Sequence, residues 1–359
     1  MSTFTRGSTS TSTSTSTGST SDGRNGTMNG TMNATTPEAK LRPRLSGMTW
    51  LVWRQHRAGF WTILAATALS VAWIVHQRGQ LVDFLDGHGY PGKSLDEAGG
   101  TFSQYADAFS FVSIGLQAIP VLLGVFLGAP LIAGDLENGT AKLVAAQSGN
   151  RTRWLTTKLA LAGLVVVVST GVLSAVFGWW WNPVKSESLA MEWTSAEAFN
   201  TTGPVPVALT LLSVFGGVAL GVVLRRTLTA MVVTFGFTVA LQLVWGYFLL
   251  SLGNVVTVTT NKGVMGESGP PPLPHGAYEI DQSFVTGSGD LLGWGTCSES
   301  GADAARQACL DKADVVGWST DYLPLSQMNA MQWFGSSILF ALTAGVVAFL
   351  FLWGRKRLV

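Results

Sequence analysis

Six long apolar segments without a formal charge decide what this chain can fold into. They are 17 to 25 residues long and lie at Gly59–Val75, Phe109–Ala133, Leu159–Trp181, Val205–Leu224, Leu228–Leu252 and Trp333–Trp353. About 20 apolar residues in a helix cross the hydrocarbon core of a bilayer, and only helices or closed barrels satisfy the backbone there. Charged residues make up 12% of the chain, against about 25% in soluble domains. The sequence therefore predicts an all-α polytopic membrane protein with six transmembrane helices, and it excludes an ordinary soluble enzyme.

The charged residues of the connecting segments are sorted by side. If both termini are cytoplasmic, 16 of the 22 Lys and Arg residues lie inside, whereas 17 of the 21 Asp and Glu residues lie outside. Arg225 and Arg226 stand in a hairpin so short that it can only be an anchor at the membrane edge. An excess of basic residues in short cytoplasmic segments sets the orientation of membrane proteins. We therefore predict a multi-pass protein of the cell membrane, surrounded by lipids, with both termini in the cytoplasm.

The predicted organisation along the chain follows from these spans. The Ser- and Thr-rich tail has too few apolar residues to form a core, and a basic stretch with several Trp residues leads from it into the first span. That stretch is either a short interfacial helix or a simple positive anchor. Met1 and Met48 both remain candidates for the translation start. The predicted regions are 1–39 (disordered tail), 40–58 (interfacial lead-in helix), 59–252 (transmembrane helices one to five, with a cytoplasmic loop at 134–158), 253–332 (extracytoplasmic loop) and 333–359 (transmembrane helix six and a basic cytoplasmic tail).

The two cysteines of the chain, Cys297 and Cys309, both fall in the predicted outer segment. Outside the cytoplasm thiols are free to oxidise, and two cysteines allow one pairing. We favour a disulfide between them, with two free thiols as the alternative. Ala302–Val315 is rich in Ala, with charged residues interspersed, and is predicted to form a helix that is too polar to cross the membrane.

The chain offers few residues for chemistry. Its four His residues are scattered, without the spacing of a metal site. Residues 87–94 match the P-loop pattern, but no buried strand precedes them and they are predicted to lie outside, so we regard the match as coincidental. The polar mid-span residues Gln117 and Gln242 serve either as hydrogen-bonding contacts between helices, which we favour, or as the lining of a cavity. We predict no enzymatic activity, no cofactor or metal in this chain, and no nucleic-acid partner.

The densest local pattern lies in the inner segment between the second and third spans. Asp135 and Glu137 directly follow a span end, although acidic residues are otherwise rare on this side. The Gly139-Thr140 turn comes next, and a basic stretch leads into the third span, with Lys158 as its last charge. The pattern fits a short helix on the inner surface, where a soluble partner could push it. A simple turn back into the membrane, flanked by snorkelling basic side chains, is the alternative.

This segment resembles the permease subunits of actinobacterial ABC-2 type transporters, a family of ATP-binding-cassette transporters. That family shows an acidic pair, a Gly-Thr turn, a Ser-Arg-x-Arg-Trp-Leu-like stretch and a Lys at the start of the third span. The corresponding residues are Asp135, Glu137, Gly139, Thr140, Arg151, Arg153, Trp154, Leu155 and Lys158. Gly149-Asn150 departs from the Ser or Val that is usual before the first Arg. The lead-in at 50–57 and the Met331-Gln332-Trp333 start of the last span extend the resemblance over about 45–359.

The resemblance implies a permease of exporter type that pairs with a second copy or a homologous permease and docks cytoplasmic ATPase subunits, which bind the ATP. Within this framework Asp135, Glu137, Gly139, Thr140, Arg151, Arg153 and Lys158 are the candidate ATPase-coupling residues. Our hypothesis is that the two acids pair with basic residues of the ATPase. The alternative function is a membrane sensor or resistance scaffold that binds a ligand with its outer loop and transports nothing.

Overall fold

The computed structural model describes residues 48–93, 95, 100–139, 151–187, 190–265, 269–299 and 301–357. All of these fall within one compact unit, Leu45–Val359. Its main elements are α1 (Met48–His88), α2 (Ser103–Leu123), the π-helical turn η2 (Gly124–Gly128), α3 (Pro130–Glu137), α5 (Arg151–Trp181), α6 (Ala196–Phe199), α7 (Val205–Leu224), α8 (Thr227–Phe248), β1 (Val256–Thr259), β2 (Tyr278–Thr286), β3 (Leu291–Gly293), α9 (Asp303–Lys312), β4 (Val315–Leu323) and α10 (Met328–Arg357). Single 3-10 turns follow α5 and α8 and precede α10: η3 (Asn182–Val184), η4 (Leu250–Leu252) and η5 (Leu325–Gln327).

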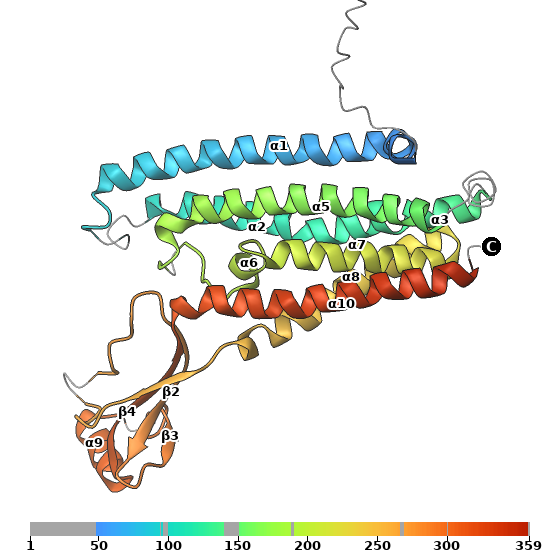
Figure 1. Cartoon of the computed structure of the whole chain (residues 1–359). Helices are drawn as coiled ribbons and strands as arrows, with labels where there is room; N and C mark the ends of the chain where they lie inside the picture. Colours follow the sequence, from blue (N-terminus) through green and yellow to red (C-terminus); the bar gives the residue numbers. More distant parts are fainter. Residues whose placement is uncertain are drawn as a thin grey trace, which may run out of the picture. The chain divides into compact units, whose positions relative to one another are not determined.

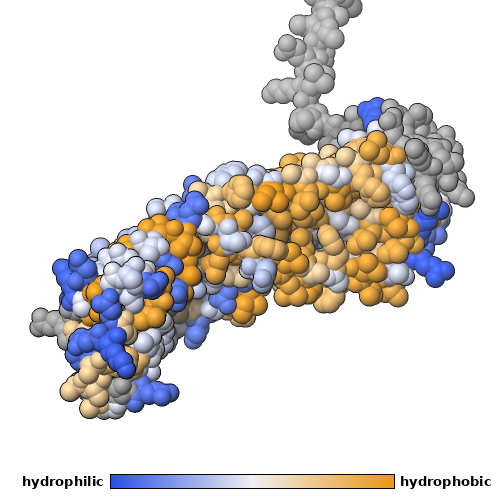
Figure 2. All heavy atoms as spheres, turned by 90° about the horizontal axis from the view of Figure 1, so that it is seen from below, coloured by the Kyte–Doolittle hydropathy of each residue, from blue (hydrophilic) through white to orange (hydrophobic). Residues whose placement is uncertain are grey.

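Six helical stretches of the described chain are long and apolar enough to cross a membrane. They are Thr49–His88, Gly100–Glu137, Thr152–Val184, Val205–Leu224, Thr227–Phe248 and Leu325–Trp353. Each overlaps one of the charge-free segments of the sequence, so the predicted fold class is confirmed. The helices α1, α2, α5, α7, α8 and α10 run side by side, and a small sheet lies beyond one end of them (Figure 1). Figure 2 shows apolar side chains gathered over the middle of the helices and hydrophilic ones at both ends.

The first helix is longer than the sequence predicted. Where a lead-in helix and a separate 17-residue span were expected, α1 runs without a break over 41 residues. At 1.5 Å per residue it is about 60 Å long, twice the hydrocarbon thickness, so its ends reach past the membrane interior. Its last turn contains Gly87 and His88. A helix and not a strand therefore precedes the P-loop-like residues, which removes the structural context of a phosphate-binding loop.

The second span is interrupted where it meets α7. Pro120 lies inside α2, and the five residues of η2 form a π-helical turn before α3 begins at Pro130. Such turns arise where one extra residue is accommodated in a helix. A Cβ atom added at Gly128 would lie 2.4 Å from the backbone oxygen of Val214, and one added at Gly221 would lie 2.5 Å from that of Ala129. Small residues therefore allow the two backbones to approach each other closely.

Helix α7 is the centre of the bundle. It contacts α2, η2, α3, α5, α8 and α10. In its most apolar stretch 67% of the residues are buried, whereas the corresponding value for α1 is 11%. Helix α1 packs mainly against α5 and leaves the rest of its surface to the surroundings. A helix that is apolar on all sides is expected either inside a bundle or against lipid, and α7 and α1 show the two cases.

The segment between α8 and α10, predicted to lie outside, contains a sheet that the sequence did not predict. Its four strands follow the order β1-β4-β2-β3, and every neighbouring pair is antiparallel. The aromatic rings of Phe284 on β2 and Trp318 on β4 pack with their centroids 4.6 Å apart. The predicted helix is present as α9, and β4 starts three residues after its end at Lys312. A disulfide joins Cys297 to Cys309 on α9, with the Cα atoms 5.9 Å apart.

Candidate functional site

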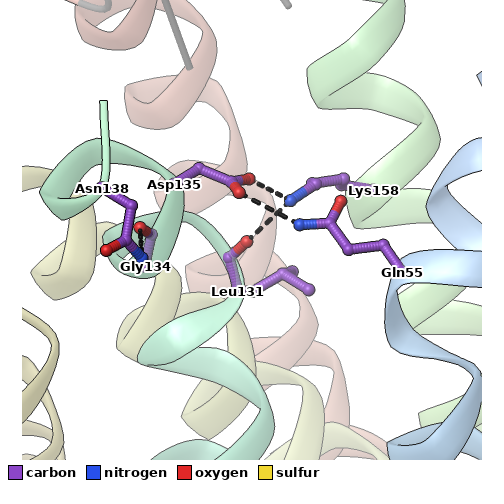
Figure 3. Close-up of polar contacts among 6 residues, drawn as sticks. All are labelled: Gln55, Leu131, Gly134, Asp135, Asn138 and Lys158. Atoms are coloured by element: carbon purple, nitrogen blue, oxygen red, sulfur yellow. Dashed lines mark hydrogen bonds and ion pairs between the residues drawn. The ribbon is translucent and has the colours of Figure 1, made fainter. Parts of the chain in front are cut away.

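A buried lysine organises the end of the bundle where α3 finishes and α5 begins. The side chain of Lys158 on α5 is fully buried, and its ammonium group forms an ion pair with the carboxylate of Asp135 on α3. The same nitrogen donates a hydrogen bond to the backbone oxygen of Leu131 at 3.0 Å. Leu131 and Asp135 are four residues apart on α3, so both face α5. Figure 3 shows the lysine reaching between them.

Helix α1 joins the same cluster through a neutral side chain. The Nε2 atom of Gln55 donates a hydrogen bond to Oδ1 of Asp135 at 3.0 Å, so the two oxygens of this carboxylate bind two different helices (Figure 3). The ring of Trp154 lies 4.9 Å from the Lys158 nitrogen, one helical turn before it on α5. A buried charge is tolerated only where a counter-ion and hydrogen bonds replace its water. Lys158 has both, and the cluster binds α1, α3 and α5 together.

The second acid of the pair, Glu137, contacts a different helix. Its Oε2 atom accepts a hydrogen bond at 2.8 Å from the backbone N–H of Thr227, the first residue of α8. The first N–H groups of a helix have no partner within the helix, and a carboxylate placed there also interacts favourably with the helix dipole. Glu137 therefore joins the end of α3 to the start of α8. The N-cap residue Arg226 makes no side-chain hydrogen bond of this kind.

Helix α3 ends at Glu137, and the next two residues close it. The backbone N–H and the side-chain Nδ2 of Asn138 both donate to the backbone oxygen of Gly134, at 3.1 and 2.9 Å. Gly139 has a φ of 69°, the left-handed conformation that commonly ends a helix and that glycine adopts without strain. The glycine of the predicted Gly-Thr turn thus closes the helix and directs the chain into the loop.

The structure describes some of the predicted coupling residues and not others. It brings Asp135 and Lys158 together, and it places Glu137 and Gly139 at the end of α3. Thr140 lies outside the described residues, as does the loop through 150; α5 begins at Arg151, whose side chain is also outside them. Arg153 is exposed on the first turn of α5.

Sequence reasoning missed the partners of the acids. Gln55 and Thr227 lie 80 and 90 residues away from the acids they contact, and no periodicity links such positions. His56, next to Gln55, has a buried Nε2 atom without a hydrogen-bond partner among the described residues. The one available signal was the isolated Lys158 at the start of a span, since a buried charge implies an opposite charge nearby.

A second polar group of residues lies in the other half of the bundle, at a cavity of about 390 Å³. The Nε2 atom of Gln242 on α8 donates to the backbone oxygen of Gln117 on α2 at 2.9 Å. The Nε1 atom of Trp245 donates to Oδ1 of Asn200, which follows α6, at 2.7 Å. Gln117, Asn200 and Gln242 all line the cavity. The two glutamines therefore make a contact between helices and also line a cavity.

Three connecting segments, after α1, after α5 and between β1 and β2, contact one another. The hydroxyl group of Tyr90, after α1, donates to Oε1 of Glu187, after α5, at 3.2 Å. The same oxygen lies 3.9 Å from Nε2 of His275 in the segment between β1 and β2. Burial, and after it the negative charge of Glu187, raises the pKa of Tyr90. The Nε1 atom of Trp193 donates to the backbone oxygen of Gly276 at 2.9 Å, so the segment between β1 and β2 is joined to the loop after α5.

The comparison with known proteins agrees with this arrangement of helices. The family described as ABC-2 membrane transporter related matches residues 64–249, just over half of the chain. The chain belongs to this family. No curated protein and no solved structure matches the chain.

Membership in the ABC-2 related family identifies the chain as a membrane component of a transporter and not as a catalytic subunit. The matched residues run from within α1 to the end of α8 and contain Asp135, Glu137, Lys158 and the cavity, but not Gln55. The sheet, α9 and α10 lie beyond the match.

Proposed function

We propose that this chain is the permease subunit of an ATP-binding-cassette exporter of the actinobacterial ABC-2 type. A separate cytoplasmic ATPase drives it, and it works beside a second copy or a homologous permease. The observation that carries the proposal is the family match over five of the six spans. The sensor or scaffold interpretation has no such support.

In the proposed orientation both termini and the 140–150 loop are cytoplasmic, and the sheet is outside. The distribution of basic residues supports this orientation, since 16 of 22 then lie inside. The disulfide supports it as well, because the bond between Cys297 and Cys309 then lies in a compartment where oxidation is permitted.

The proposed coupling role of Asp135 and Glu137 is based on the contacts they make at the end of α3, just before the 140–150 loop. Asp135 and Glu137 have partners within the chain, so we revise our hypothesis from direct pairing with the ATPase to positioning of the loop. The Lys158–Asp135 ion pair joins α5 to α3, on the two sides of the loop. The Gln55 hydrogen bond joins α3 to α1, and the Glu137 contact joins α3 to α8. An ATPase that pushes on the loop would then move α1, α3, α5 and α8 together.

The test is to purify the tagged full chain from its own host in mild detergent. We expect an ATPase of the cassette type to co-purify, identified by mass spectrometry, and the complex to hydrolyse ATP. Glu137→Ala, which frees the start of α8, is expected to insert normally but to retain less ATPase or to lose stimulation of hydrolysis by substrate.

The matched control is Glu279→Ala, because Glu279 is an exposed acid on β2, in the outer segment. It should behave as the parent does. If no ATPase accompanies the parent chain, the permease proposal is wrong. If Glu137→Ala retains full ATPase binding and stimulation, the coupling role of Glu137 is wrong.

A further inference from the structure

The cavity beside Gln117 and Gln242 is built from uncharged polar groups and apolar walls. Its lining consists of Gln117, Pro120, Ala196, Asn200, Leu209, Gln242, Leu243 and Gly246, contributed by α2, α6 with the residue after it, α7 and α8. At about 390 Å³ it falls in the range of small-molecule sites, about 300–1,000 Å³. None of these lining residues is charged, although three carry carboxamides.

The three carboxamides are only partly used by the protein. The donor of Gln242 is taken by the backbone of Gln117, and the acceptor of Asn200 is taken by Trp245. Among the described residues, nothing bonds to the Oε1 atom of Gln242, the Nδ2 atom of Asn200 or the side-chain amide of Gln117. Buried atoms elsewhere in the bundle also lack partners within the described chain, among them Trp180 Nε1 and Ser336 Oγ. The open donors and acceptors of the three carboxamides differ because these residues line a cavity, where a bound molecule can reach them.

Gly246 leaves open space at the wall of the cavity, as some other glycines of the spans do on their own helices. A Cβ atom added at Gly246 would meet no atom within 4 Å. The contrast with Gly128, where the same atom would be 2.4 Å from a backbone oxygen, shows that Gly246 does not serve a close approach of helices. Pro120 on α2 also lines the cavity and, because it lacks an N–H, offers no backbone donor there.

We propose that this cavity binds an uncharged amphipathic molecule, with hydroxyl or amide groups hydrogen-bonded to Gln117, Asn200 and Gln242. A charged group would lose its hydration without finding a counter-ion in the lining, which is costly. A purely apolar molecule would leave the carboxamides without partners. This inference rests on the proposed permease function only for calling the molecule a substrate; the binding itself does not depend on it.

The test uses the full chain in lipid nanodiscs and a photoreactive octyl glucoside, with photoreactive octyl sulfate and octyltrimethylammonium as charged probes. Labelling is mapped by mass spectrometry, and the specific part is that displaced by excess unlabelled octyl glucoside. We expect displaceable labelling of α2 and α8 by the glucoside alone. Equal displaceable labelling by the charged probes, or none by the glucoside, would overturn the proposal.

Two variants address the site by independent routes. Gln117→Met removes a side chain that bonds to no described residue, so the fold should persist while displaceable labelling falls roughly fivefold, the effect of one hydrogen bond. Gly246→Leu fills the open space and should abolish the labelling. Gln80→Met, on α1 away from the cavity, is the matched control and should label as the parent does. Unchanged labelling in both cavity variants would overturn the proposal.

The same preparations separate the two proposals. ATPase co-purification with Gln117→Met should equal that of the parent, because the residue is remote from the 140–150 loop. If the ATPase co-purifies but the cavity shows no displaceable labelling, this inference fails alone. If the cavity labels as expected but no ATPase is found, the binding site stands and the permease proposal fails.

Discussion

The Lys158 cluster and the cavity beside Gln117 and Gln242 differ in how their polar side chains are satisfied. At the Lys158 cluster a full charge is buried, and an ion pair, a backbone oxygen and a glutamine surround it. At the cavity the polar groups are neutral, yet several of their donors and acceptors find no partner among the described residues. The difference separates two uses of polarity: the first region holds helices together, and the second leaves hydrogen-bonding capacity for something else.

The largest expected effect comes from breaking the satisfied cluster. Asp135→Leu would leave the buried ammonium group of Lys158 without its counter-ion. Removing one member of a buried pair typically costs about 3–5 kcal/mol. We expect a correspondingly large fall in the thermal unfolding temperature of the detergent-solubilised chain.

The double variant Asp135→Leu with Lys158→Met is the control. It removes both charges and leaves apolar side chains of similar size, a replacement that is often neutral or stabilising. It should recover most of the loss. If the single and the double variant unfold at the same temperature, the cluster does not stabilise the bundle through charge pairing.

A second prediction compares the stability cost of adding a methyl group at Gly128, which is tightly packed, and at Gly246, which is not. Gly128→Ala forces backbone atoms of η2 and α7 apart, because the added carbon would lie 2.4 Å from the oxygen and 3.0 Å from the Cα of Val214. Overpacking of this kind costs about 1–3 kcal/mol. Gly246→Ala adds the same methyl group where nothing lies within 4 Å, and should be neutral or gain up to about 1 kcal/mol from helix propensity.

Thermal unfolding of the two alanine variants measures this contrast directly. Equal stability would mean that α7 tolerates separation from the second span. It would also mean that the close approach at Gly128 is not needed to hold the bundle together.

What the sequence could reveal depended on whether the signal was local. The spans were predictable because each is a continuous apolar run, and so was α9, from its Ala-rich composition. The sheet was missed because its largest pairing joins β2 to β4 across α9 and a disulfide-bonded turn. The alternation of Val and Thr in β1 was not taken as a strand. The start of α1 was missed because its first turns carry charges, and the sequence therefore predicted a separate lead-in before the span.

The candidate sites show the same limit. Asp135, Lys158, Gln117 and Gln242 stood out in the sequence as polar residues at or within spans. Their partners come from helices that meet only in the fold, and the sequence therefore assigned the acids to an external protein. Asn200 and Gly246 carried no signal at all, because nothing local distinguishes a glycine beside a cavity from a glycine facing lipid.

The smallest expected effect concerns a carboxyl group that lacks the partners Asp135 has. Glu192, in the loop after α5, is half-buried and accepts no side-chain hydrogen bond from a described residue. Burial raises the pKa of its carboxyl above the usual value of 4.5. The folded chain therefore binds the proton more tightly than the unfolded chain does. This group should stop affecting stability below about pH 4.5, and it should lower stability as the pH rises towards its folded-state pKa.

Glu192→Gln should remove this dependence. The variant should match the parent in unfolding temperature at pH 4 and exceed it slightly at pH 7, within the roughly 0.5 kcal/mol typical of surface changes. If the parent is more stable than Glu192→Gln at pH 7, the ionised carboxylate has a favourable partner. Glu192 would then be a stabilised carboxylate, as Asp135 is.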